Sequence, residues 1–72
     1  MTEKRTCYTI RVAYNINTEQ NYKTKEYKII ATNDNIACDE TVNINKTNFI
    51  NNKNYKYIGL AIINREEVYI IK

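Results

Sequence analysis

The chain has 72 residues, a formal net charge of +3 and 43% apolar residues, so it can build one domain around one modest core. It contains no histidine and no proline, and Gly59 is its single glycine. Without histidine there is no ordinary Ser-His or Cys-His nucleophile pair, and without a glycine-rich loop there is no phosphate cradle. We therefore expect a single domain over residues 1–72 that is not an enzyme and binds no cofactor.

Two cysteines, Cys7 and Cys38, are present. A closed zinc site needs four nitrogen or sulfur ligands, so two cysteines without histidine predict no metal. The longest apolar run, residues 58–63, is far shorter than the roughly 20 residues of a membrane-spanning helix. No apolar segment follows the polar start Met1–Arg5, so no signal peptide is indicated. We expect a cytoplasmic protein with reduced cysteines and no membrane partner, since a disulfide between them would require export.

Asn and Ile each occur twelve times and Tyr seven times, and with Lys these residues share AT-rich codons. The composition indicates an AT-rich genome, such as that of a low-GC bacterium or one of its phages. Much of the Asn excess is then explained by codon bias and needs no chemical role.

The N-terminal part of the chain predicts a hairpin. Large apolar side chains alternate with smaller or polar ones along residues 8–16, which is the period of a half-buried strand. Residues 17–21 are all polar and predict a turn. A second strand is expected over residues 22–32, with Tyr27, Ile29 and Ala31 on one face.

A helix is predicted over residues 34–46. Asn33 and Asp34 are good helix N-caps, and acidic residues early in the segment suit the helix dipole. The residues that follow at helical spacing are Ile36, Ala37, Glu40, Thr41 and Ile44. A strand remains the alternative, because Thr41–Asn45 also alternates and Asn and Thr are mediocre helix formers.

The C-terminal part predicts two further strands. Residues 45–54 are expected to form a loop, with the Phe49 side chain inserted into the core. Residues 55–64 are apolar on both faces and are expected to form a central strand. Gly59 indicates a bulge or a close contact with the helix. Residues 64–67 predict a turn, and residues 68–71 the last strand. The predicted fold is α+β with ββαββ order, a four-stranded antiparallel sheet with one helix packed on a face; the alternative is an all-β small barrel or sandwich.

The first function hypothesis is a non-enzymatic protein-binding module. The first hairpin holds more tyrosines than a small core absorbs, and tyrosine is frequent at interface hot spots. The predicted partner-binding residues at the hairpin tip are Tyr14, Tyr22, Lys23, Lys25 and Tyr27. A homodimer that pairs sheets or edges is a further way to enlarge the core. Size and composition suggest a phage or mobile-element accessory protein that acts as a stoichiometric inhibitor or adaptor of a larger host complex, such as a defence nuclease.

The alternative hypothesis is a small basic protein that binds RNA or single-stranded DNA. Its predicted residues share the sheet face opposite the large side chains of the first strand, and they are Arg11, Lys28, Tyr55 and Tyr57. Tyrosines interleaved with basic residues on an open sheet can stack on unpaired bases. A solvated amphipathic sheet face has the same composition, since tyrosine also favours strands for packing reasons.

Overall fold

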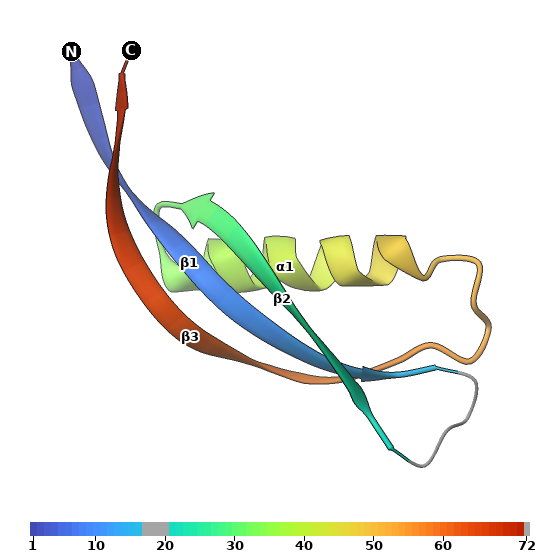
Figure 1. Ribbon diagram of the computed structural model, residues 1–72. Coiled ribbons are helices and arrows are strands. Elements are labelled where there is room, and N and C mark those ends of the chain that lie inside the picture. The colour runs from blue at the N-terminus through green and yellow to red at the C-terminus, as the bar shows by residue number, and fades with distance from the viewer. Residues whose placement is uncertain (17–20, 72) are drawn as a thin grey trace.

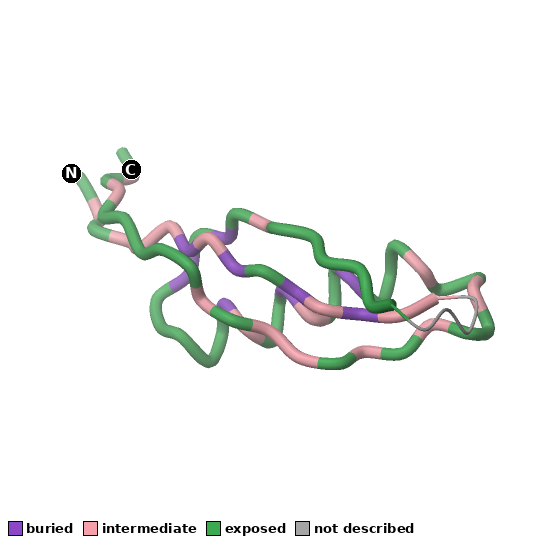
Figure 2. The backbone as a smooth tube through the Cα atoms, turned by 60° about the horizontal axis from the view of Figure 1, so that its bottom comes forward, coloured by how far each residue is buried: buried purple, intermediate pink, exposed green. Residues whose placement is uncertain are grey.

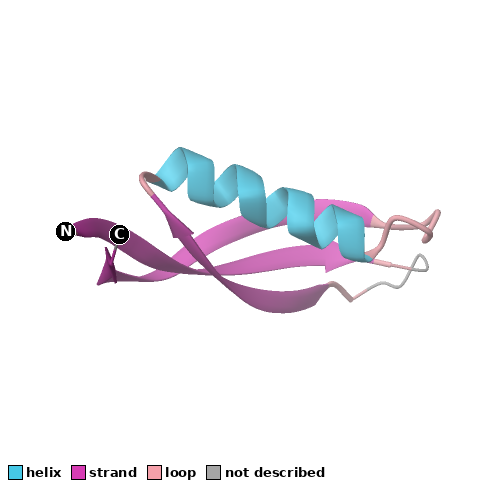
Figure 3. Cartoon of the chain, turned by 90° about the horizontal axis from the view of Figure 1, so that it is seen from above, coloured by secondary structure: helices cyan, strands magenta, loops and turns pink. Residues whose placement is uncertain are grey.

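A computed structural model describes residues 1–16 and 21–71. It consists of β1 (Thr2–Asn15), β2 (Lys23–Ala31), α1 (Asp34–Asn48) and β3 (Lys56–Ile71). The strands form an antiparallel sheet in the order β2-β1-β3, and α1 lies across one face of it (Figures 1 and 3). The α+β class is confirmed, whereas the prediction of four strands is wrong.

The first hairpin matches its prediction, except that β1 is longer than expected. β2 pairs with β1 in a register that places Tyr8 opposite Ile29 and Ile10 opposite Tyr27. The predicted turn falls mostly on residues 17–20, which lie outside the described residues. β1 begins at Thr2 rather than at Tyr8, because its first residues pair with the end of β3.

The error in strand number lies in β3, which runs unbroken through the predicted turn at residues 64–67. Arg65 and Glu67 pair with Tyr8 and Thr6 of β1, so the backbone there stays in the sheet. The Nζ of Lys4 lies 2.9 Å from Oε1 of Glu67 across the two strands. Residues 64–67 contain no glycine or proline that would force a turn. Their polar character reflects their position on an exposed edge strand.

β3 is an edge strand and not the predicted central one, because β1 holds the centre of the sheet. Two register shifts against β1 leave Ile58 and Ile63 without a direct partner on that strand. Both side chains are about half exposed, at 51% and 47%. The predicted bulge beside Gly59 is therefore confirmed, whereas the alternative of a close contact with the helix is wrong, since no atom lies within 4 Å of a Cβ placed there.

The core lies between the sheet and α1, as the burial pattern in Figure 2 shows. β1 contributes its even-numbered residues, which confirms the predicted alternation. The buried apolar residues are Tyr8, Ile10, Val12, Tyr14, Ile29, Ala31 and Ala37. Phe49 packs against this core with its ring 4.8 Å from that of Tyr14, as predicted.

The helix prediction over residues 34–46 is confirmed and extends to Asn48, which excludes the strand alternative. The Asn33 side chain accepts a 2.9 Å hydrogen bond from the Ile36 backbone N–H, so it caps the helix. The buried face differs from the predicted one, because it consists of Ala37, Thr41 and Asn45. Of the residues predicted at helical spacing, Ala37 and Thr41 are buried, whereas Ile36 and Ile44 are exposed. Residues four apart share a helix face, and the buried row begins at Ala37.

Polar groups under the helix satisfy one another. The Asn45 side chain is fully buried and donates a 3.0 Å hydrogen bond to the hydroxyl of Tyr27. Its carbonyl oxygen accepts a hydrogen bond from the Tyr55 hydroxyl. The Thr41 hydroxyl donates to the Ala37 carbonyl at 2.7 Å. A buried polar group without such a partner would be destabilising, so these bonds allow a small polar helix face to pack on the sheet.

Beyond the helix, β1 and β3 continue as a two-stranded ribbon that carries both chain ends side by side (Figure 1). Here Thr2 pairs with Ile71 and Lys4 with Tyr69. Among the described residues, no helix has the length and apolar character needed to cross a membrane.

Candidate binding surface

The sheet face opposite α1 is left open, and it is formed by the odd-numbered residues of β1 between Arg5 and Ala13 (Figure 3). The helix packs against β2 and β1 from the other side only, where Tyr8, Ile10 and Val12 are buried. We call the uncovered surface the open face. No other element of the part of the chain that the structure describes covers it.

A shallow hollow of about 250 Å³ lies on this open face, near the hairpin end. Its floor is made by small residues on neighbouring strands, since Ala13 pairs with Thr24 on one side and Gly59 on the other. The next row places Ala61 beside Arg11. Because these side chains are short, they leave space where larger residues would have filled the face.

Tyr22 and Arg11 line the hollow beside the small residues of its floor, and we call these two larger residues its rim. Tyr22 is 63% exposed. Arg11 lies with its Nη2 3.2 Å from Oε2 of Glu26, an ion pair that is about half exposed on both sides. The hollow therefore combines an apolar floor, an exposed aromatic ring and a guanidinium group whose charge is balanced.

A second ion pair lies on the same face of the sheet. Arg5 lies 2.6 Å from Glu3, on the same face as the hollow. Basic and acidic groups thus alternate along the open face instead of forming a continuous basic patch. Such a patch is the usual electrostatic feature of a nucleic-acid footprint.

The structure divides the predicted partner-binding residues between the two faces. Tyr14 is buried in the core, and Tyr27 is half-buried with its hydroxyl bound to Asn45. Lys23 and Lys25 are exposed at the outer end of β2 on the helix side, in register with Tyr14 and Val12. Tyr22 alone of these five lies at the hollow.

The residues of the nucleic-acid alternative are also separated. Arg11 and Lys28 lie on the open face. Tyr55 lies under the helix, where its ring stacks on that of Phe49 at 5.7 Å, and burial raises the pKa of its hydroxyl. Tyr57 is the register partner of buried Tyr14 and packs against the core on the same side. The two tyrosines therefore do not share a surface with the two basic residues.

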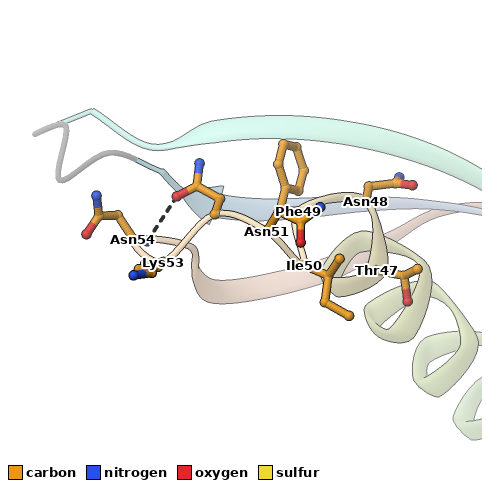
Figure 4. A pocket seen from close by; sticks show the side chains of 8 residues that line it. Thr47, Asn48, Phe49, Ile50, Asn51, Lys53 and Asn54 are labelled. Atoms are coloured by element: carbon orange, nitrogen blue, oxygen red, sulfur yellow. Dashed lines mark hydrogen bonds between the residues drawn. The ribbon is translucent and has the colours of Figure 1, made fainter.

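The loop after the helix surrounds a larger and wide-open cavity of about 550 Å³ (Figure 4). Its lining comes from one continuous segment, Thr47–Asn54, and half of these residues are asparagine. The Asn52 side chain accepts a 2.9 Å hydrogen bond from the Asn54 backbone N–H, drawn as the dashed line. The Asn52 amide thus shapes the loop, and we assign this cavity no chemistry.

An ion pair joins the start of the helix to β3. Two nitrogens of the Arg65 side chain lie 2.7 and 3.3 Å from the Asp34 carboxylate. Hydrogen bonds from Arg65, and next from Tyr8, lower the pKa of Asp34. Burial, with Asp34 as the second cause, raises the pKa of Tyr8. In the described ranges, residues 1–16 and 21–71, no group of three or more acidic or cysteine side chains is placed to hold a metal ion.

Sequence reasoning missed the floor of the hollow, Ala13, Gly59 and Ala61. A signal was present in the pattern, because Gly59 and Ala61 are the small residues at alternate positions of an otherwise large-residue strand. Alternate positions share one face of a strand, so this spacing indicates a depression on that face. Comparison of the chain with protein-family models, with curated proteins and with solved structures finds no match.

Proposed function

We propose that this chain is a non-enzymatic protein-binding module that docks its partner on the open face of the sheet. The observation that carries the proposal is the hollow floored by Ala13, Gly59 and Ala61, with exposed Tyr22 at its rim. Tyrosine and arginine dominate interface hot spots, and an apolar side chain of the partner fits a floor of small residues. The partner's contact is therefore a protuberance with an apolar tip.

Charge supports a protein partner over a nucleic acid. Arg11 is neutralised by Glu26 and Arg5 by Glu3, so neither offers an uncompensated charge to a phosphate. The tyrosines of the nucleic-acid alternative lie on the helix side of the sheet. A balanced, partly apolar surface is typical of protein interfaces.

We further propose that the module works in the cytoplasm as a stoichiometric inhibitor or adaptor encoded by a phage or mobile element. The excess of Asn, Ile, Lys and Tyr, whose codons are AT-rich, supports this setting. Cys7 and Cys38 are free thiols, which suits a reducing compartment.

The test is affinity capture of the tagged chain from the lysate of a low-GC bacterium, with and without nuclease and at low and high salt. The wild-type chain should retain one discrete protein under all four conditions. Tyr22→Ala should weaken capture by about 30-fold, the effect of losing roughly 2 kcal/mol at a hot spot. Gly59→Leu should weaken it as well, because its side chain fills the hollow without meeting any neighbour within 4 Å of the Cβ.

Tyr69→Ala is the matched control. Tyr69 is 65% exposed, slightly more than Tyr22, but it lies on the terminal ribbon. Its variant should capture the partner as the wild-type chain does. Capture of nucleic acid that disappears with nuclease or salt contradicts the proposal, as does equal loss of the partner in Tyr22→Ala and Tyr69→Ala.

A further inference from the structure

The two edges of the sheet differ in how they are protected. β2 carries charged residues at Lys23, Lys25, Glu26 and Lys28, which discourage pairing with another chain. β3 has no charged residue and no proline along residues 57–63, where two isoleucines are half exposed. The outer edge of β3 is therefore the edge that can accept another strand.

The faces of β3 are symmetric about Ala61. Tyr57 pairs with Tyr14 and Arg65 with Tyr8, so both lie on the helix side of the sheet. The two register shifts lie on opposite sides of Ala61 and compensate each other. Apart from the bulged residues Ile58 and Ile63, residues equidistant from Ala61 therefore share a face, which is the condition for pairing the strand with a copy of itself.

We infer that a second copy of this chain pairs antiparallel with β3 about a two-fold axis at Ala61. In this register Leu60 lies opposite Ile62 of the second copy, both on the helix side of the sheet. Lys56 of each copy lies opposite Glu66 of the other copy on the open face, so the interface contains two such pairs. Both residues are exposed, and neither has an ion-pair partner in the described part of the chain.

Neighbouring registers are less complementary. A shift of one residue in one direction places Lys56 opposite Arg65, two like charges. A shift in either direction matches residues of opposite faces, such as Leu60 with Ala61 or Ala61 with Ile62. Pairing about Ala61 gives a continuous six-stranded sheet with an isologous interface. Ala61 also lines the hollow, so the two hollows of the dimer lie close to the axis on one common face.

Sedimentation equilibrium over a range of protein concentrations tests this dimer. The wild-type chain should dimerise reversibly. Lys56→Glu and Glu66→Lys should each raise the dimer dissociation constant about tenfold, because each replaces two attractive cross-strand pairs with two repulsive ones. The double variant Lys56→Glu/Glu66→Lys should recover the wild-type value, because the two charges are exchanged between facing positions.

Lys53→Glu makes the same change in net charge on the loop and should leave the dissociation constant unchanged. A chain that stays monomeric at every concentration overturns the inference. Single variants without effect, or a double variant that does not recover, overturn it also. The hollow is complete within one copy, so the Lys56→Glu variant should still capture the partner at a concentration at which it is monomeric. This result separates the dimer from the proposed function.

Discussion

The two faces of β1 differ in exposure, because one is buried in the core and the other forms the open face that we propose as the binding surface. On one face Ile10 and Val12 are fully buried under the helix. On the other, Arg11 and Ala13 alternate with them and line an open hollow. Side chains of a strand point alternately to its two faces, so alternate residues of one strand can form a core on one face and an open surface on the other. Substitutions on the two faces should have separable effects, and the predictions below test that separation.

The largest expected effect is on the covered face. Ile10→Ala removes a fully buried side chain from the centre of the core and should lower the free energy of unfolding by about 2–5 kcal/mol. The neighbouring Thr9→Ala, on the open face, should change it by less than about 0.5 kcal/mol. Urea unfolding followed by circular dichroism measures both. Similar losses in the two variants would show that the faces do not differ in their role.

A smaller loss is expected from the polar interior of the same face. Asn45→Ala leaves the hydroxyls of Tyr27 and Tyr55 without their shared partner, which should lower stability by about 1–3 kcal/mol. Its matched control is Asn43→Ala, an exposed position on the same helix. The same urea titration distinguishes them. If the two asparagine variants are equally stable, the buried network does not hold the helix on the sheet.

The helix cap should contribute about 1 kcal/mol. Asn33→Ala removes the acceptor for the Ile36 N–H and should destabilise the protein by this amount. The control is Asn35→Ala, which removes an asparagine side chain two residues further on. Asn35 is exposed and is not the cap. Thermal unfolding of the two variants should rank Asn33→Ala clearly lower. The reverse ranking would mean that the helix does not begin at this cap.

The weakest effect is the pH dependence of the Asp34–Arg65 pair. The folded pKa of Asp34 is lowered, so its stabilising contribution is complete above the ordinary value of 3.8 and is lost as the pH falls through the folded value. Wild type should exceed Asp34→Asn in stability at neutral pH, and the gap should close under acid conditions below 3.8. Unfolding curves at a series of pH values measure the gap. A gap that is independent of pH would exclude the ion pair as its cause.

Sequence patterns predicted the elements that depend on local spacing. The alternation from Tyr8 to Tyr14 and the cap at Asn33 are encoded in neighbouring residues, and both are confirmed. The prediction of a turn at residues 64–67 was wrong, because that segment pairs with the N-terminal half of β1. This contact joins distant parts of the chain and leaves no local pattern in the sequence. A polar run on an exposed edge strand and a polar turn have the same composition.

The candidate site was harder to predict because it depends on faces and register. Tyr14 and Tyr27 were assigned to a binding surface, but their side chains lie on the helix side of the sheet. The sequence identifies Tyr22 as a tyrosine at the predicted hairpin tip, but its position beside Ala13 and Gly59 follows only from the register of all three strands. Small residues carry no reactive group, so the sequence gives them weight only once that register is known.

The most direct test of the central claim is hydroxyl-radical footprinting of the chain with and without its captured partner. This method reports the solvent access of side chains, and Tyr22 and Tyr69 begin from nearly equal exposures of 63% and 65%. A partner docked on the open face should suppress labelling of Tyr22 and leave Tyr69 and the helix residue Ile36 unchanged. Suppression at Ile36 or Tyr69 with Tyr22 still labelled would contradict the assignment of binding to the open face.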